Sequence, residues 1–235
     1  MKPNLVFALD FQDKEKIDYW INITESSFDW YKVGMEAFYS MGDYALQTLF
    51  TKNKHIFLDL KLNDIPNTVY RATKAILIHY PVDMINMHLI SGKESVKAFK
   101  DAVIEVSNMR RKTIYSIGVT ILTSLSEDDM SIIGINNIAE TVSNLSTMAF
   151  ECGLDGVVCS TKEAPNIKQH LGSSFLTVTP GIRFDSQDAA DQRRTGTLVE
   201  AAKWSDFAVI GRALTQSEDP NLTLEHMKEM LEGLS

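Results

Sequence analysis

Three ionisable side chains of alternating sign lie within six residues of one another, at Asp59, Lys61 and Asp64. Asp59 and Lys61 are two residues apart in an apolar segment, so we expect their side chains on one face of a strand. A pair of this kind could simply be a buried ion pair. A lysine ammonium held beside a carboxylate could also stabilise a negative charge that develops in a reaction, or donate a proton to it.

Two more ionisable residues favour the second interpretation. Asp10 follows the apolar segment 5–9, and Lys32 lies near the end of the apolar segment 30–33. Charged groups at the ends of buried strands cost free energy unless they meet each other or a ligand. Two lysines and two carboxylates exceed what one neutral pair requires, so the four residues predict a preorganised electrostatic site.

Asp64 has a simpler explanation when it is considered alone. Pro66 suits the first turn of a helix, which would make Asp64 a helix-capping residue and Thr68 an ordinary first-turn threonine.

A second group of polar residues could bind a phosphate. Arg183 precedes the polar loop 184–196, which contains Gln192, and Gly211-Arg212 follows the last apolar segment with backbone N–H groups and a guanidinium. Loops after the seventh and eighth strands commonly hold phosphate in eight-stranded α/β barrels. The loop has the composition of a lid that closes over a ligand. The alternative is that these arginines are exposed surface charges.

Metal and thiol chemistry are not indicated. His88 follows an apolar segment but has no second histidine or carboxylate at metal-ligand spacing, so we expect it to be a hydrogen-bonding residue. Cys152 and Cys159 are too few for a disulfide framework, and the apolar surroundings of Cys159 predict a small buried side chain. The chain has no Walker motif, no dinucleotide-binding glycine motif after its first strand and no Ser-His-Asp signature.

The elements that must position these residues alternate regularly. Apolar, β-branched segments that predict strands occur at 5–9, 30–33, 56–60, 84–87, 114–119, 156–159, 176–179 and 207–210. Segments with helical apolar spacing follow them at 14–23, 36–50, 67–79, 93–106, 137–150, 162–171, 198–203 and 222–231. Strands that alternate with helices imply parallel pairing. Eight such units predict an α/β fold, a single (β/α)₈ TIM barrel that occupies residues 1–235 as one domain.

This architecture places active sites where strands end and the following loops begin. The residues at those ends include Asp10, Lys32, Asp59 and Lys61, with Thr123 just after the fifth strand. They should therefore converge on one rim of the barrel.

Composition excludes several classes of partner. The 235 residues carry a net charge of −8, which argues against a nucleic-acid or anionic-membrane surface because both require a broad basic face. The apolar segment near the N-terminus is too short for a signal peptide, and no later segment reaches the ~18 apolar residues of a membrane span. We therefore expect a cytoplasmic protein.

Residues 57–68 (FLDLKLNDIPNT) closely resemble the D-x-K-x-x-D-I-P-x-T signature of orotidine 5′-phosphate decarboxylases. The resemblance extends over the whole chain in order, and its phosphate-gripping segments look like those of bacterial members. The other matching segments are 8–10 (ALD), 31–34 (YKVG), 119–124 (VTILTS), 178–183 (VTPGIR), 191–194 (DQRR) and 209–212 (VIGR).

The resemblance implies decarboxylation of orotidine 5′-monophosphate to uridine 5′-monophosphate in de novo pyrimidine biosynthesis, without a metal or other cofactor. Lys61 would protonate the C6 carbanion beside Asp59, while Asp10 and Lys32 would hold the ribose. Asp64 and Thr68 would reach into the neighbouring site of a homodimer. Thr123 would contact the pyrimidine, and the phosphate would be bound by Arg183, Gln192, Gly211 and Arg212.

Two other functions remain open at this stage. Sugar-phosphate decarboxylases or aldolases on related barrels use a similar D-x-K-x-x-D to help hold Mg²⁺, although the Ile65-Pro66-x-Thr68 continuation favours the nucleotide enzyme. A non-catalytic barrel that only grips phosphate should have lost Lys61 or Asp59, and both are present.

Overall fold

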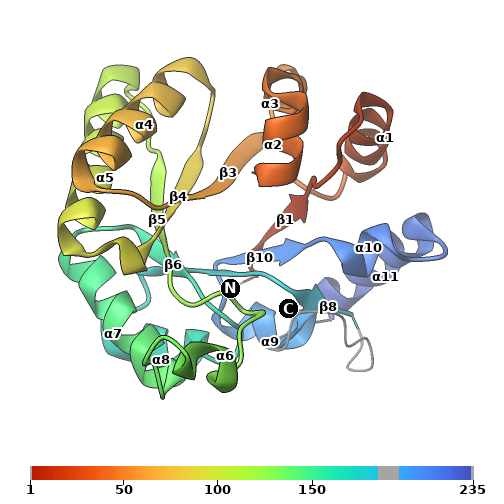
Figure 1. Ribbon diagram of the computed structural model, residues 1–235. Helices are drawn as coiled ribbons and strands as arrows, with labels where there is room; N and C mark the ends of the chain where they lie inside the picture. Colours follow the sequence, from red (N-terminus) through yellow and green to blue (C-terminus); the bar gives the residue numbers. More distant parts are fainter. Residues whose placement is uncertain (1, 185–195, 234–235) are drawn as a thin grey trace.

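The computed structural model describes residues 2–184 and 196–233, which form a closed barrel of eight parallel strands surrounded by helices (Figure 1). The order around the barrel is β1-β10-β7-β6-β5-β4-β3-β2, and β1 pairs with β10 to close it. The eight strands are β1 (Asn4–Ala8), β2 (Trp30–Gly34), β3 (His55–Leu62), β4 (Met84–His88), β5 (Tyr115–Val119), β6 (Gly156–Val158), β7 (Leu176–Thr179) and β10 (Phe207–Ile210). All eight predicted strands are confirmed, each within two residues at either end.

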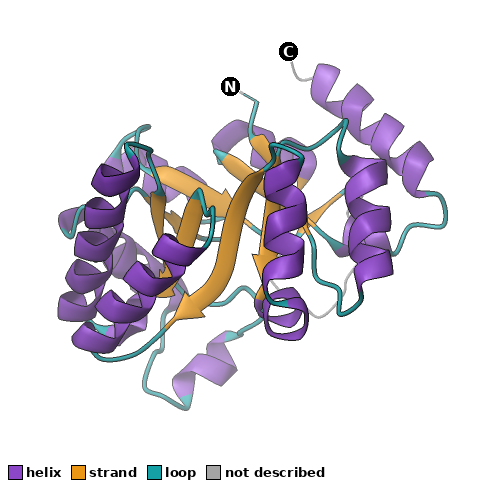
Figure 2. Ribbon diagram, turned by 90° about the horizontal axis from the view of Figure 1, so that it is seen from above, coloured by secondary structure: helices purple, strands orange, loops and turns teal. Residues whose placement is uncertain are grey.

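Helices cover the outside of the barrel, as the view from above shows (Figure 2). They are α1 (Lys14–Thr24), α2 (Met35–Met41), α3 (Asp43–Thr51), α4 (Pro66–His79), α5 (Lys93–Arg110), α6 (Glu127–Ser131), α7 (Ile138–Glu151), α8 (Ala164–Leu171), α9 (Leu198–Trp204), α10 (Arg212–Thr215) and α11 (Pro220–Glu232), with a 3₁₀ turn, η1 (Leu89–Ser91). Two short segments, β8 (Ile182–Arg183) and β9 (Gly196–Thr197), form a separate parallel pair. No described helix is long and apolar enough to cross a membrane.

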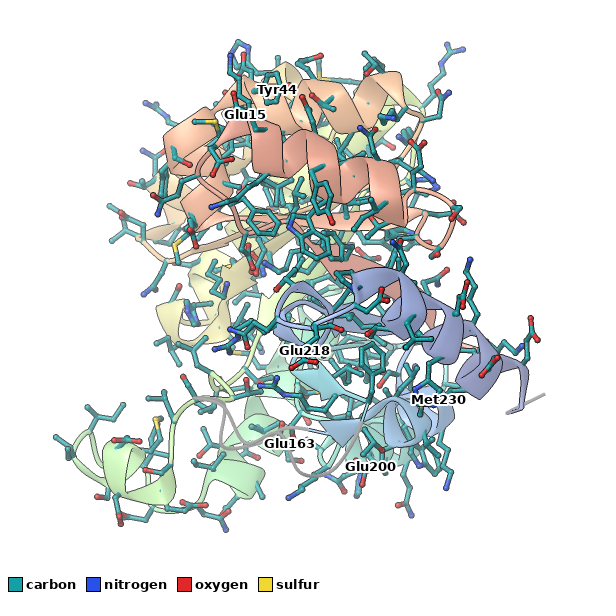
Figure 3. The ribbon with its side chains drawn as sticks, turned by 90° about the vertical axis from the view of Figure 1, so that its right-hand side faces the viewer. Glu15, Tyr44, Glu163, Glu200, Glu218 and Met230 are labelled. Atoms are coloured by element: carbon teal, nitrogen blue, oxygen red, sulfur yellow. The ribbon has the colours of Figure 1, made fainter. Side chains whose placement is uncertain are left out.

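The predicted helix 36–50 is wrong in one respect, because the chain breaks it into α2 and α3 at Gly42. Gly42 has φ +54° and ψ −122°, a combination that a residue with a Cβ rarely adopts. Tyr44 of α3 lies on the outside of the barrel, near the top of Figure 3. Its hydroxyl links α3 to α1 by donating a hydrogen bond to Asp18 Oδ2 at 2.7 Å.

The inside of the barrel is packed at its N-terminal end by aromatic rings. Trp30 and Phe207, the first residues of β2 and β10, have ring centroids 5.1 Å apart, and Tyr115 of β5 lies 6.0 Å from Phe207. A second, larger layer of apolar side chains lies between the strands and the helices. Because the N-terminal end is filled, open space inside the barrel is confined to the carboxyl ends of the strands.

The N-terminal end is also fixed by a repeated polar contact. Asp83, Asp155 and Asp206 each directly precede a strand, and each carboxylate accepts a hydrogen bond from the backbone N–H of the second residue of the neighbouring strand. These donors are Ile56 at 2.9 Å, Ser116 at 2.7 Å and Thr177 at 2.7 Å. The contacts satisfy buried backbone groups and hold β3–β4, β5–β6 and β7–β10 in register.

Candidate active site

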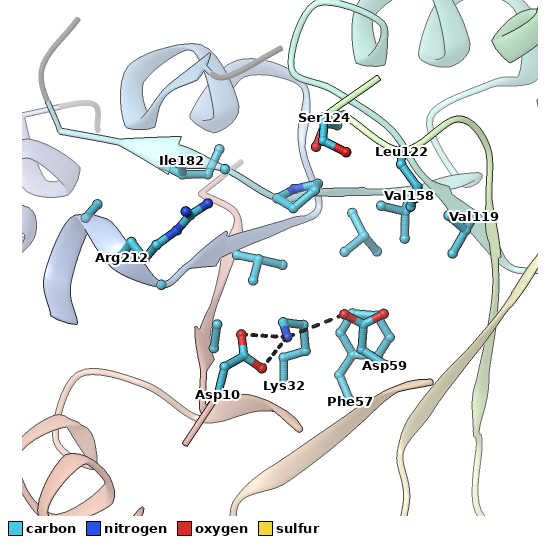
Figure 4. A pocket seen from close by; sticks show the side chains of 18 of the residues that line it. Asp10, Lys32, Phe57, Asp59, Val119, Leu122, Ser124, Val158, Ile182 and Arg212 are labelled. Atoms are coloured by element: carbon cyan, nitrogen blue, oxygen red, sulfur yellow. Dashed lines mark hydrogen bonds and ion pairs between the residues drawn. The ribbon is translucent and has the colours of Figure 1, made fainter. Parts of the chain in front are cut away.

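A cavity of about 530 Å³ opens at the carboxyl ends of the strands. Most residues predicted for the site line it, as the close view illustrates (Figure 4). They are Asp10, Lys32, Asp59, Lys61, Thr123, Arg183, Gly211 and Arg212. Residues from seven of the eight barrel strands, or from the segments that follow them, meet in this one space.

The four central ionisable groups form a continuous chain of alternating charge. Lys32 Nζ lies 3.0 Å from Asp10 Oδ1 and 3.4 Å from Asp59 Oδ2 (Figure 4). Lys61 Nζ lies 2.7 Å from Asp59 Oδ1. Asp59 is therefore held between two ammonium groups, and the order along the cavity wall is Asp10, Lys32, Asp59, Lys61.

This arrangement keeps the inner groups charged. Burial alone would raise the pKa of Asp59, but the Lys32 and Lys61 charges, with hydrogen bonds from Lys61 and Asn86, lower the pKa to about 2. Burial alone would lower the pKa of Lys32, yet the charges of Asp59 and Asp10 outweigh it and raise that pKa above its usual value. The cavity therefore presents fixed charges at neutral pH.

The prediction that Asp59 and Lys61 face the same way is correct, but simple strand alternation does not explain it. Leu58 pairs with Ile85 and Leu62 pairs with Met87, so three residues of β3 lie opposite Asn86 alone. Within this bulge Lys61 has φ +53°, in the left-handed region that non-glycine residues seldom occupy. The bulge aims both side chains at the cavity.

Gly34 at the end of β2 makes room for the first charge pair. A Cβ at this position would lie 2.6 Å from Asp10 Oδ1 and 3.0 Å from Lys32 Nζ. Any side chain there would push the carboxylate or the ammonium out of place. The glycine in the YKVG segment is thus required by close packing against the site.

The opposite side of the cavity carries the arginines. Arg183 lies at the end of β8 and is only 7% exposed, and its buried Nε has no hydrogen-bond partner among the described residues. Arg212 begins α10 directly after Gly211 and reaches the cavity from the side of β10 (Figure 4). The predicted contact Gln192 and most of the loop 184–196 lie outside the described residues.

Asp64 and Thr68 do not line this cavity. Both side chains lie on an exposed segment, residues 63–68, in which Ile65 is 66% exposed. The helix-capping interpretation of Asp64 is wrong, because the N-cap of α4 is Ile65. The Asp64 carboxylate instead accepts a hydrogen bond from the Ile65 N–H at 2.7 Å.

His88 lies at the end of β4 beside the charged chain. Burial and the nearby Lys61 charge lower the pKa of its imidazole, which favours the neutral form. Its buried Nδ1 has no hydrogen-bond partner among the described residues, which departs from the expected hydrogen-bonding role. Across the described part of the chain no group of three His, Cys, Asp or Glu residues could hold a metal ion.

Asn86 belongs to the site although its sequence pattern did not predict it. This residue is fully buried in β4, donates to Asp59 and accepts from the backbone of Lys61. The feature that could have indicated Asn86 is a single amide side chain in the otherwise mostly apolar strand Met84–His88. Glu36, Phe57 and Ser124 line the cavity itself, although nothing in their spacing indicated it.

Comparison with known proteins agrees with this geometry. Residues 3–227 match the family model described as "Orotidine 5'-phosphate decarboxylase / HUMPS family". The chain is 40% identical over 238 residues to the orotidine 5′-phosphate decarboxylases of Bacillus mycoides (strain KBAB4) and Bacillus cereus (strain AH820), with all of each chain covered. The crystal structure of orotidine 5′-phosphate decarboxylase from Lactobacillus acidophilus matches with a TM-score of 0.83 and 32% identity, covering 98% of this chain and 99% of that one. An uncharacterized conserved protein from Geobacillus kaustophilus matches with a TM-score of 0.81 and 34% identity, covering 97% and 99%.

Proposed function

The chain belongs to the orotidine 5′-phosphate decarboxylase / HUMPS family, and from this premise we propose that it converts orotidine 5′-monophosphate to uridine 5′-monophosphate in pyrimidine biosynthesis. The observation that carries the proposal is the alternating chain Asp10–Lys32–Asp59–Lys61 in a cavity that also contains Arg183 and Arg212. The charged chain suits a reaction that creates negative charge, and the arginines suit a substrate that carries a phosphate.

The chemistry requires stabilisation of a carbanion. When the bond between C6 and the carboxylate breaks, CO₂ leaves and the electron pair stays on C6 in the plane of the pyrimidine ring, where the π-system cannot delocalise it. The ammonium of Lys61 would first stabilise this charge and then donate a proton to C6. The products are uridine 5′-monophosphate and CO₂, with no oxidant or reductant consumed.

An ammonium group in the cavity can stabilise a negative charge on the substrate by several kcal/mol. An ammonium about 4 Å from a unit negative charge contributes on the order of 4 kcal/mol at an effective dielectric constant near 20, and more when water is excluded. Asp59 would lie beside the substrate carboxylate and hold Lys61 in place at 2.7 Å. Lys32 fixes the other oxygen of Asp59, so the positive charges do not need to reorganise during the reaction.

The remaining cavity residues would bind the rest of the nucleotide. Asp10, whose side chain is 43% exposed at the rim, and Lys32 would contact the ribose hydroxyls. Thr123, after β5, would contact the pyrimidine edge. Such contacts, remote from C6, can supply binding energy that orders the reacting groups.

The phosphate would be bound at the far end of the cavity by Arg183, Gly211 and Arg212, together with Gln192. The Nε of Arg183, which has no hydrogen-bond partner among the described residues, supports this assignment, because a buried guanidinium nitrogen without an acceptor is costly unless a ligand supplies one. Bidentate arginine–phosphate contacts would fix the position of the nucleotide along the cavity.

We propose that the active unit is a homodimer. Asp64 and Thr68 lie on an exposed segment that follows Lys61 in the chain and do not line the charged cavity, while the side chain of Ile65 is 66% exposed. If this segment packed against a second copy of the chain, Ile65 would be buried and Asp64 would lie close to the Lys61 of that second copy. The row of alternating charges, Asp10–Lys32–Asp59–Lys61, would then be extended by the carboxylate of Asp64 from the other copy.

We also propose that residues 1–235 form one domain and that the protein is cytoplasmic. The barrel accounts for all eight predicted strand units, and the net charge of −8 disfavours nucleic acid and anionic membranes as partners.

The activity is tested by following the loss of orotidine 5′-monophosphate absorbance in buffer that contains EDTA. We expect full turnover, whereas a related barrel enzyme that requires Mg²⁺ would be inactive.

Lys61→Ala should abolish turnover while a 6-substituted uridine monophosphate still binds. Replacement of the exposed Lys16, which pairs only with Asp13 in the described structure, is the matched control and should leave the rate unchanged. Near-normal activity of Lys61→Ala would refute the mechanism.

A further inference from the structure

Asn86 is a fully buried amide in a strand that is otherwise apolar at its centre. Its Nδ2 donates to Asp59 Oδ1 at 2.7 Å, and its Oδ1 accepts from the backbone N–H of Lys61 at 2.8 Å. One side chain therefore contacts both members of the reactive pair.

The position of Asn86 follows from the β3 bulge. Three residues of β3 lie opposite this single residue of β4, so the backbone N–H of Lys61 hydrogen-bonds to a side chain. The left-handed backbone of Lys61, at φ +53°, is unfavourable for a residue with a Cβ. The hydrogen bond to Asn86 compensates for part of that cost and holds the bulge open.

The same amide also orients Asp59. Asp59 Oδ1 accepts from both Lys61 Nζ and Asn86 Nδ2, which leaves Oδ2 for Lys32. Without the amide donor, only the two ammonium groups of Lys32 and Lys61 would hold the orientation of the carboxylate. A side chain that is both donor and acceptor is needed to bind a carboxylate and an N–H at once, and an amide provides both.

We propose that Asn86 is a positioning residue, which sets the place of the Lys61 ammonium by fixing the Lys61 backbone and the Asp59 carboxylate together. This inference rests on the proposed function, because the Lys61 ammonium matters for rate only if it meets a developing carbanion. Asn86 itself does not line the cavity, so it acts through its two neighbours.

The proposal is tested with Asn86→Ala, which removes both hydrogen bonds, and with Asn86→Asp, which keeps the shape but loses the donor when ionised. We expect kcat to fall ~100-fold in both, because a misplaced catalytic group costs rate at this scale. KM should change less than about threefold, since substrate affinity comes from the ribose and phosphate contacts.

Ser116→Ala is the matched control. Ser116 lies on the adjacent strand β5, is also fully buried, and its hydroxyl donates a hydrogen bond to Asp155 at the opposite end of the barrel. We expect this variant to lower Tm about as much as Asn86→Ala while kcat stays near that of the wild type. An equal loss of kcat in the two variants would assign Asn86 a structural role only and overturn the proposal.

Crystal structures of the wild type and both Asn86 variants separate this inference from the proposed function. We expect the variants to lose the contact between Lys61 Nζ and Asp59 Oδ1, or to return Lys61 to negative φ. If the wild type does not decarboxylate orotidine 5′-monophosphate, the proposed function fails, and the structures still test the positioning role. An unchanged Lys61–Asp59 geometry in Asn86→Ala, or kcat within about threefold of wild type, would overturn it.

Discussion

The Asp59 carboxylate has both oxygens engaged, Oδ1 by Lys61 and Asn86 and Oδ2 by Lys32. These contacts stabilise the ionised form and lower the pKa to about 2. Because the folded pKa lies below the unfolded value of about 3.9, the contribution of Asp59 to stability is fully present above the unfolded pKa. It is lost as the pH falls toward the folded pKa.

We therefore expect Asp59→Asn to lower the free energy of unfolding by about 2 kcal/mol at pH 7. The substitution leaves two ammonium groups with only Asp10 nearby, whereas the wild type is electrically balanced. The deficit should be constant between pH 6 and 8 and shrink below ~4, where the wild-type carboxylate begins to lose its advantage. Urea unfolding at several pH values measures it, and the exposed Asp128→Asn serves as the control. A deficit that persists unchanged to pH 3 would contradict the assignment.

At the scale of elements, the turn after β4 depends on a glycine in the next strand. Leu89 begins η1 and is fully buried, and a Cβ on Gly118 of β5 would lie 2.6 Å from Leu89 Cδ2. The same turn is tied to the loop after β3, since Ser91 Oγ donates to Asn63 Oδ1 at 2.6 Å. The large side chain of Leu89 occupies the space left by the absence of a side chain at Gly118.

Size complementarity predicts strong coupling between the two positions. We expect Gly118→Ala to destabilise the protein by about 1–3 kcal/mol through overpacking, and Leu89→Ala by about 2–5 kcal/mol through a cavity. The double variant should lose clearly less than the sum, because the new methyl group enters the space that Leu89 leaves. Chemical denaturation of all four proteins gives the coupling energy. Gly118→Ala combined with Leu224→Ala on α11 should be additive, and additivity in the Leu89 pair would contradict the packing argument.

At the scale of the whole molecule, the Lys61 ammonium of one chain forms an ion pair with Asp59 alone among the described residues. Asp64 lies three residues further along on the exposed segment 63–68, outside the cavity. A shared site in a symmetric dimer would reconcile these two facts, because each chain would lend Asp64 and Thr68 to the other.

Subunit mixing tests this sharing. Inactive Asp64→Ala and inactive Lys61→Ala subunits should recover activity when mixed, since each heterodimer has one intact site. Random pairing then predicts about a quarter of wild-type activity. Asp59→Ala mixed with Lys61→Ala is the matched control and should stay inactive, because these two residues belong to the same cavity. No recovery in verified Asp64/Lys61 heterodimers would count against a shared site.

Much of the fold could be predicted from local patterns. The strands of a parallel barrel are buried on both faces, so each appears as a short apolar run, and all eight were recognisable. The charged residues at their ends were visible for the same reason, because an ionisable group stands out against an apolar segment. The break at Gly42 was missed because helical apolar spacing continues across it.

The sequence by itself determined which residues meet at the rim, because parallel strands with helical crossovers bring all their carboxyl ends to one edge. Only the tertiary structure decided how they meet. The register between β3 and β4, which α4 connects, produces the bulge in β3 and the left-handed backbone of Lys61. The same register places Asn86 where it accepts a hydrogen bond from the Lys61 N–H. Asp64 lies just before α4, which begins at Pro66, one residue earlier than predicted. Register and close packing join residues far apart in the chain, so no local pattern records them.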